Sequence, residues 1–237
     1  MFSVKGQCVV SGCRTIHKIL KDHALGRNEL PKSKAERLNW VIHAETNEDM
    51  RRRYDLWAHH YDEDVGSYED YLVPVEAAKV AEHVLSKDAL IVDAGAGTGL
   101  VGQTLKDTGF QRLIAVDYSD GMLEIARQKN VYQEFHQCDL SGPTNFEKGS
   151  VDCVITCGTT SQMPCGSLRE FARIVRPGGH VIFAVVPDAW IEFGYAEVFE
   201  ELRAAGRIFV QSRGEPFQML PTTEPEFFCE IWVMNVQ

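Results

Sequence analysis

The chain has 237 residues, of which 44% are hydrophobic and 24% charged, and its formal net charge is −10. This composition is typical of a folded globular domain and excludes a disordered or fibrous chain. No segment approaches the roughly 18 unbroken apolar residues of a membrane-spanning helix, and nucleic-acid phosphates attract basic rather than acidic proteins, so we expect neither a membrane nor a nucleic acid as partner.

The first region, residues 1–47, has mixed charge and the loop-forming residues Gly26 and Pro31. We interpret it as a partly helical N-terminal extension and predict that it closes over the active site as part of a lid. Residues 48–237 are predicted to form one domain. Its first helix begins at a cap at Asn47 and runs toward His60. Aromatic and apolar residues share one face of this helix at three- and four-residue steps: Met50, Tyr54, Trp57, Ala58 and Tyr61.

A second helix is predicted from Pro74, and from residue 89 short apolar runs alternate with helical patterns. The predicted strands are 89–93, 113–117, 132–137, 151–157 and 180–186, and the predicted helices lie near 100–108, 121–130, 167–176 and 195–205. Continuous β-branched runs suit parallel strands that are buried on both faces. The alternation predicts an α/β fold with a doubly wound, mostly parallel sheet. Residues 207–213 and 227–236 follow as two strands without a helix between them, which predicts an antiparallel C-terminal hairpin at the sheet edge.

Three glycines directly follow the first strand, in the run Asp93-Ala-Gly-Ala-Gly-Thr-Gly99. Glycine permits a positive φ and lets a ligand approach the backbone closely, and the next helix offers its N-terminal amides to an anionic group. Counted from Gly97, the letters also fit the dinucleotide fingerprint GxGxxG, but that phase leaves Gly95 unexplained. The GxGxG phase from Gly95 uses all three glycines. Together with the antiparallel tail, it disfavours an NAD-dependent dehydrogenase.

Two acids close the next two strands. Asp117 follows Gly99 by 18 residues, where a carboxylate can accept hydrogen bonds from both ribose hydroxyls of an adenosine-type cofactor. Asp139 is placed to accept from the exocyclic amine of adenine, and Leu140 to pack on the ring. The alternative for either acid is a helix cap or a turn residue. The three elements together favour a cofactor site, because they occupy the carboxyl ends of successive strands.

These motifs resemble the class I S-adenosylmethionine-dependent methyltransferases, whose fold is Rossmann-like. The resemblance is carried by Asp93–Gly99, Val116-Asp-Tyr-Ser119, Cys138-Asp139-Leu140, Val151–Cys157 and Arg173–His180. A narrower likeness, to the Williams–Beuren-region methyltransferase-like proteins, is carried by Tyr54–Ala58, Tyr61-Asp62, Gly95–Gly102 and Met122-Leu123. Similarity extends from about residue 50 to 213.

The resemblance implies S-adenosylmethionine as cofactor, S-adenosylhomocysteine as product, and a set of binding residues. Gly95 and Gly97 would pass close to the methionine moiety, and the backbone at Cys157 would face its amino group. The ribose and adenine would be held by Asp117, Met122, Asp139 and Leu140. Tyr61 and Trp57 would cover the cofactor, and core packing is the alternative for both residues.

Catalytic residues are not identified by the sequence. His59 and His60, near the expected mouth of the site, and Asp188 and Glu192, after the fifth strand, are candidate bases, but surface residues of these types are commoner than catalysts. A base is needed only when the acceptor arrives protonated. The loop 158–164 lacks the histidine that the resemblance leads us to expect, so the acceptor specificity is expected to differ.

Seven scattered cysteines without a CxxC pair disfavour both a disulfide scaffold and a zinc site. Cys153 is interpreted as small apolar filler, and no metal is predicted. The N-terminus has no basic start followed by an apolar stretch, so no secretory signal is predicted. We therefore expect reduced thiols and a cytoplasmic location.

The leading hypothesis is a methyltransferase that acts on oxygen or nitrogen of a small molecule, because the loops after the fourth and fifth strands are compact and no recognition domain is added. A non-catalytic S-adenosylmethionine-binding or partner protein is the alternative, since a fold and a cofactor site do not prove turnover. The acceptor and the oligomeric state are open.

Overall fold

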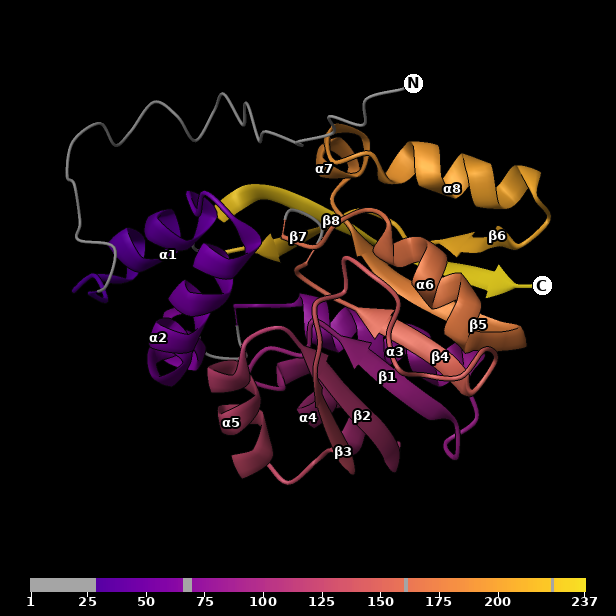
Figure 1. The fold of residues 1–237 in the computed structure, drawn as a ribbon, viewed down its shortest axis with the longest axis horizontal. Coiled ribbons are helices and arrows are strands. Elements are labelled where there is room, and N and C mark those ends of the chain that lie inside the picture. The colour runs from indigo at the N-terminus through magenta and orange to yellow at the C-terminus, as the bar shows by residue number, and fades with distance from the viewer. Residues whose placement is uncertain (1–28, 66–69, 160–161, 223) are drawn as a thin grey trace, which may run out of the picture.

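The computed structural model describes residues 29–65, 70–159, 162–222 and 224–237, and its framework is one mixed β-sheet (Figure 1). Eight strands make up the sheet in these residues, in the order β3-β2-β1-β4-β5-β8-β6, with β7 paired to β8. Their bounds are β1 (Leu90–Ala94), β2 (Arg112–Asp117), β3 (Glu134–Gln137), β4 (Val151–Thr156), β5 (Val175–Val185), β6 (Ile208–Arg213), β7 (Phe217–Leu220) and β8 (Glu224–Val236).

Strands β1 to β5 run parallel, and β8 is antiparallel to β5, β6 and β7. The predicted doubly wound fold with an antiparallel C-terminal pair is therefore confirmed. The sequence missed β7, a four-residue strand that extends the pairing of β8. Three strands begin two or more residues from the predicted start: β3 at Glu134, β8 at Glu224, and β5 at Val175, where β5 is irregular opposite Val151.

The helices are α1 (Lys34–Ile42), α2 (Asn47–Val65), α3 (Val73–Val84), α4 (Leu100–Asp107), α5 (Asp120–Gln128), α6 (Ser167–Ile174), α7 (Pro187–Glu192) and α8 (Tyr195–Ala204). The predicted helices are thus present. Helix α2 extends beyond the predicted His60, and α7 is an additional short helix that begins at Pro187.

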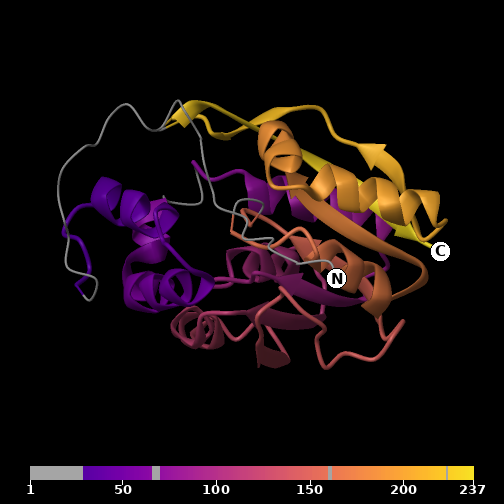
Figure 2. The ribbon, with the colours of Figure 1, turned by 45° about the horizontal axis from the view of Figure 1, so that its top comes forward.

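The two faces of the sheet carry separate apolar cores, because successive strand residues point to opposite faces. Ile91 and Cys153 belong to the core beneath α3, α4 and α5, whereas Val92 and Val154 belong to the core beneath α6, α7 and α8. Figure 2 shows α3 and α8 on opposite sides of the sheet. Cys153 is fully buried, which agrees with its interpretation as small apolar filler.

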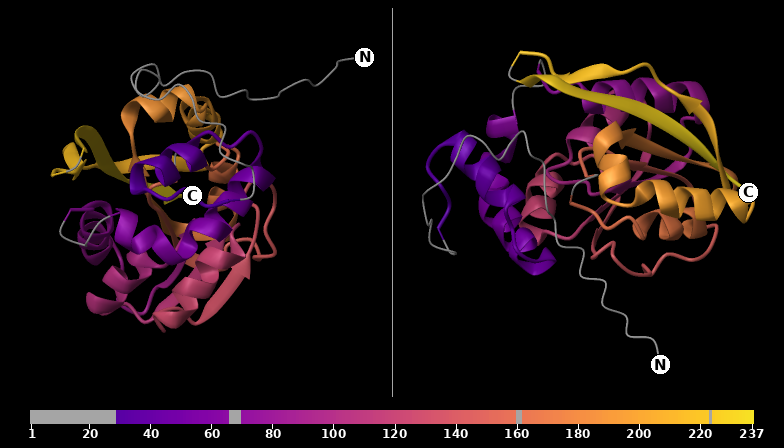
Figure 3. Two further views of the ribbon diagram at one scale, coloured as in Figure 1. Left: turned by 90° about the vertical axis from the view of Figure 1, so that its left-hand side faces the viewer. Right: turned by 90° about the horizontal axis from the view of Figure 1, so that it is seen from above.

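Helices α1 and α2 form a third packing unit, centred on Trp40, Val41 and Trp57. Helix α1 begins with a capping box, in which Ser33 and Glu36 exchange side-chain and backbone hydrogen bonds. The pair lies beside α5, at the end of the sheet where the parallel strands finish, and the left panel of Figure 3 looks onto it. Of the N-terminal extension predicted for residues 1–47, residues 1–28 lie outside the described part of the chain.

Candidate functional site

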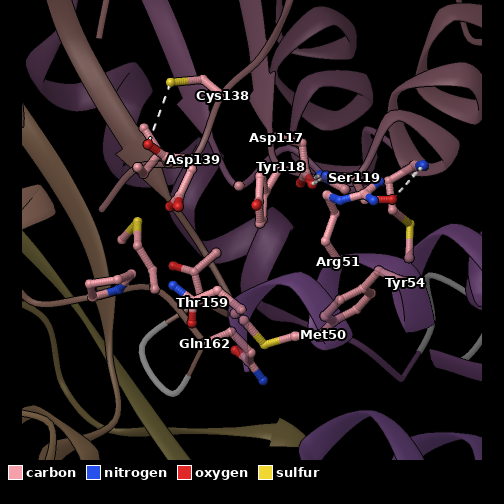
Figure 4. Close-up of a pocket in the computed structure, with 18 of the residues that line it drawn as sticks. Met50, Arg51, Tyr54, Asp117, Tyr118, Ser119, Cys138, Asp139, Thr159 and Gln162 are labelled. Carbon is pink, nitrogen blue, oxygen red and sulfur yellow. Dashed lines mark hydrogen bonds between the residues drawn. The ribbon is translucent and has the colours of Figure 1, made fainter. Parts of the chain in front are cut away.

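A pocket opens between α2 and the carboxyl ends of the parallel strands (Figure 4). Eight of the nine cofactor residues predicted from the sequence line it: Tyr61, Gly95, Gly97, Asp117, Met122, Asp139, Leu140 and Cys157. The topology brings them together because β1, β2, β3 and β4 are neighbours whose carboxyl ends share one edge.

The glycine turn after β1 is shaped by hydrogen bonds to the neighbouring strand. The amides of Gly95 and Ala96 donate to the carbonyl oxygen of Val116 at 2.8 and 3.0 Å. Gly95 and Gly97 have φ values of +76° and +54°, which side chains disfavour. A Cβ at Gly95 would collide with Thr159, whereas one at Gly97 would project into open space. The turn therefore leaves an open cradle beside the backbone of Gly97.

Asp117 connects the glycine turn to the loop that follows β2. Its two carboxylate oxygens accept hydrogen bonds of 2.8 Å from the amides of Gly97 and Ser119. Burial raises the pKa of the carboxyl above its ordinary value, and the backbone donors work in the opposite direction. Each oxygen keeps a further lone pair, so the carboxylate can accept two hydroxyl donors from a ligand. The open cradle and this carboxylate fit the ribose of an adenosine-type cofactor.

The N-terminus of α5 is held jointly by Ser119 and by α2. Ser119 caps α5 by accepting from the amide of Met122 at 3.1 Å. Asp55 of α2 accepts from the Ser119 hydroxyl at 2.6 Å and from the Gly121 amide at 3.0 Å. The helix that borders the pocket is thus bonded to the loop that carries Asp117.

A second connection lies at the other end of α2. Asp62 accepts from the hydroxyl of Thr98, in the glycine turn, and pairs with Lys129 at 2.7 Å. No local sequence pattern indicates either connection, because the partners are 36 to 67 residues apart.

Tyr61 lines the pocket, but Trp57 does not. The Trp57 indole is 1% exposed, donates to Asp64 at 2.6 Å and packs its ring edgewise on Tyr61 at 4.9 Å. Its position matches core packing, the alternative named above, because a buried indole N–H needs an acceptor. Burial raises the pKa of Tyr61 to about 12, so its hydroxyl stays protonated at neutral pH.

The structure adds lining residues that the sequence did not single out as site residues. They are Asn47, Met50, Arg51 and Tyr54 of α2, Tyr118 and Ser119 after β2, Cys138, and Gly158, Thr159, Gln162, Met163 and Pro164 after β4. Tyr54 had a usable signal, since it shares a helix face with Tyr61. The loop after β4 had another, since ligands bind beyond the carboxyl ends of parallel strands.

None of the four candidate bases lines this pocket. His59, His60, Asp188 and Glu192 are all exposed. Burial raises the pKa of the Cys157 thiol well above its ordinary value, so this lining cysteine stays protonated. Among the described residues, no cluster of three or more His, Cys, Asp or Glu side chains is placed to hold a metal ion. No helix in the described ranges is long and apolar enough to span a membrane.

Asp93, at the end of β1, is a buried acid behind the glycine turn. Its Oδ2 accepts from the hydroxyl of Tyr132 at 2.5 Å, while its Oδ1 is buried without a partner. Burial raises the pKa of Asp93 from 3.8 to about 7. The folded protein therefore keeps a proton that the unfolded chain releases above pH 4.

This difference predicts a pH-dependent loss of stability. Because the folded state binds more protons, the contribution of Asp93 to the free energy of unfolding falls as pH rises from about 4 to about 7, by up to about 1.4 kcal/mol per unit. The free energy of unfolding of Asp93→Asn, measured with urea, should therefore rise relative to that of the wild type as pH increases from about 4 to about 7. That of the exposed control Asp107→Asn should not. Parallel profiles for wild type and Asp93→Asn would contradict the assignment.

Comparison with known proteins agrees with this geometry. Residues 92–183 match the family described as "Methyltransferase domain". Methyltransferase-like protein 27 of Homo sapiens is 38% identical over 133 residues, which are 54% of this chain and 54% of that protein. The chain spans about half or less of the length of the curated relatives it matches. This match confirms the narrower likeness to the Williams–Beuren-region proteins.

Solved structures share the fold at lower identity. One is the complex between the Haloferax volcanii Trm112 methyltransferase activator and its partner, with a TM-score of 0.58, 22% identity, and coverage of 77% of this chain and 96% of that one. The [4+2]-cyclase SpnF has a TM-score of 0.62 at 17% identity, with coverage of 81% and 97%. At these identities the likeness shows the fold alone. Residues 92–183 thus match a methyltransferase domain, and the chain shares its fold with solved S-adenosylmethionine-dependent methyltransferases.

Proposed function

We propose that this protein transfers a methyl group from S-adenosylmethionine to an oxygen or nitrogen atom of a small molecule. The observation that carries the proposal is the open cradle at Gly97 beside Asp117, inside a pocket that is also lined by α2 and by the loop after β4. Asp117 would hold the ribose. Asp139, Leu140 and Met122 would surround the adenine.

S-adenosylmethionine, when bound, would supply a methyl group activated by its sulfonium: the methyl carbon would bond to an acceptor lone pair in line, the carbon–sulfur electron pair would stay on sulfur as a thioether, and any acceptor proton would pass to solvent. The protein mainly has to orient the acceptor and exclude water. Tyr61 and Tyr54 of α2 present aromatic surface to the pocket, and such faces stabilise a neighbouring cation. Their raised pKa values keep both hydroxyls neutral.

Calorimetric titration of the purified chain with S-adenosylmethionine, S-adenosylhomocysteine and NAD tests the cofactor. We expect micromolar binding of the first two and none of NAD. Methyl transfer to phenol and amine acceptors, followed by mass spectrometry, tests the reaction. Folded protein that binds neither sulfur compound would refute the proposal.

A non-catalytic S-adenosylmethionine-binding protein is the second candidate, because none of the base candidates named from the sequence lines the pocket. Tyr61→Phe separates the two candidates. Retained cofactor binding with reduced methyl transfer would support catalysis. Cofactor binding without methyl transfer to any acceptor in the wild type would favour the binding protein.

We further propose that residues 1–47 act as a cover for the site. Helix α1 packs Trp40 and Val41 on Trp57, which supports Tyr61 from behind, and Asn47 lines the pocket. Deleting residues 1–47 is expected to weaken S-adenosylhomocysteine binding about tenfold, because Trp57 loses its cover and Tyr61 its support. Unchanged affinity and activity in the truncated protein would refute the lid.

A further inference from the structure

Two carboxylates from different parts of the chain bind the same residue beside the pocket. Asp55 of α2 accepts from the Ser119 hydroxyl at 2.6 Å, and Asp117 accepts from the Ser119 amide at 2.8 Å. Asp55 also accepts from the amide of Gly121 at 3.0 Å. Two negative charges therefore meet at the start of α5. Like charges repel at such short range, and each one favours protonation of the other.

This repulsion matters for Asp117, the residue assigned to the ribose. Burial raises the pKa of its carboxyl, the backbone amides of Ser119 and Gly97 lower it, and the charge of Asp55 raises it further. The carboxylate already accepts from those two amides. It can accept two ribose hydroxyls as well only while it is ionised, because a protonated carboxyl loses part of its accepting capacity.

Arg51 supplies a positive charge at this place. Its guanidinium donates to Asp55 Oδ2 at 2.7 Å, while Ser119 and Gly121 donate to Oδ1, so both oxygens of Asp55 are bonded. Figure 4 shows Arg51 reaching from α2 toward Ser119. The Arg51 and Asp55 side chains are 24% and 27% exposed, so water weakens their attraction without removing it. Among the described residues, Arg51 is the only lysine or arginine that lines the pocket.

Other titratable groups border Asp117 without offering it a free positive charge. They are Tyr54 and Tyr61 of α2, Asp93 of β1 with Tyr132 bonded to it, and Asp139 after β3. Burial raises the pKa of each of these three tyrosines, so their hydroxyls stay neutral. On α5, the ammonium of Lys129 is paired with Asp62 at 2.7 Å. The charge of Asp55 is therefore balanced by Arg51.

We propose that Arg51 is a positioning residue of the cofactor site: by neutralising Asp55, it allows Asp55 and Asp117 to bind Ser119 as two carboxylates, so that Asp117 can accept the ribose hydroxyls. The inference rests on the proposed function, which supplies the adenosine-type ligand. Arg51 acts through Asp55 and Ser119, and this role requires no contact between Arg51 and the ligand.

A carboxyl ¹³C NMR titration of the full chain without ligand tests the electrostatic step. The Asp117 signal is identified by its absence in Asp117→Asn. Arg51→Gln should raise the pKa of Asp117 by about half a unit to one unit, because Asp55 keeps its charge and loses its cation. Arg51→Lys should reverse most of this change, since it restores the charge without the planar guanidinium.

Arg52→Gln is the matched control. Arg52 lies one residue along α2, pairs with Asp49 at 2.9 Å and does not line the pocket. The substitution removes the same charge from another face of the helix. It should therefore leave the pKa of Asp117 unchanged.

The pH profile of S-adenosylhomocysteine binding tests the consequence for the site. Calorimetry would cover about pH 5 to about pH 8, where this ligand keeps a net charge of about zero. The affinity should fall as the pH drops through the pKa of Asp117. In Arg51→Gln this loss should begin about half a unit to one unit higher, which makes the acid-side affinity about three- to tenfold lower than in the wild type. A merely structural role would lower the affinity by the same factor at every pH.

A double-mutant cycle with Asp55→Asn identifies the route of the effect. Asparagine keeps an oxygen that can accept from Ser119 and Gly121, but it carries no charge. Adding Arg51→Gln to Asp55→Asn should then change neither the pKa of Asp117 nor the binding profile. A change that persists in this background would show that Arg51 acts directly on the ligand or through Glu48, and it would overturn the inference.

An unchanged pKa of Asp117 in Arg51→Gln would overturn the inference as well. The proposed function fails separately. If the wild type does not bind S-adenosylhomocysteine at any pH, that function falls. The NMR titration needs no ligand, so it would still decide whether Arg51 keeps Asp117 ionised.

Discussion

Asp117→Ala is expected to weaken binding of S-adenosylmethionine and S-adenosylhomocysteine by at least about 100-fold. A ligand diol would lose two hydrogen bonds to a charged acceptor, each worth about 1.5–3 kcal/mol. The same substitution frees the amides of Gly97 and Ser119, which now donate to this carboxylate at 2.8 Å. Isothermal calorimetry gives the affinity directly.

Asp120→Ala is the matched control for this substitution. Asp120 is the exposed acid three residues along the chain, and its pairing with Arg127 at 3.3 Å lies on the surface. Its removal should leave both affinities within about twofold of wild type, since exposed ion pairs contribute little. Wild-type affinity for both compounds in an Asp117→Ala protein with a native circular dichroism spectrum would contradict the assignment of Asp117 to the ribose.

Gly121→Ala is expected to lower the free energy of unfolding by about 1–3 kcal/mol and to weaken S-adenosylhomocysteine binding about tenfold. A Cβ at Gly121 would lie 2.8 Å from the Asp55 Cα and 2.9 Å from its carbonyl oxygen, so α2 would have to move away. Because α2 carries Tyr54 and Tyr61, its displacement would open the pocket.

The sign of the change in the free energy of unfolding shows whether α2 packs on α5. Alanine is a better helix former than glycine by about 1 kcal/mol, so Gly121→Ala would stabilise the protein if α2 did not pack on α5. Gly166→Ala, at the start of α6, is the control, because its Cβ would meet only Arg169 at 3.9 Å and the residue has an ordinary helical φ. Urea unfolding and limited proteolysis of α2 report the two effects. Stabilisation by Gly121→Ala would contradict the packing described here.

Local patterns were sufficient for the parallel sheet and for its glycine turn. Short apolar runs with β-branched residues, such as 113–117, are typical of buried parallel strands. Three closely spaced glycines after β1 indicate a backbone with positive φ. The same reasoning placed Asp117 and Asp139 at one edge of the sheet, because parallel strands end together. β7 and the early start of β5 were not predicted from the sequence, since both depend on pairing with distant strands rather than on their own residues.

The sequence by itself determined the fold class, through local periodicity and the spacing after each strand. The resemblance of its motifs to a known family implied the eight predicted residues that line the pocket. Only the tertiary structure decided how α2 attaches. Asp55 and Asp62 bond to partners far along the chain, and no short-range pattern marks such pairs. The tertiary structure also shows that Trp57 packs against Tyr61 and does not line the pocket, and that the side-chain oxygen of Gln162 has no hydrogen-bond partner. Position on a helix face can be read from spacing, but which atoms find partners depends on the packing of segments that meet only in the folded chain.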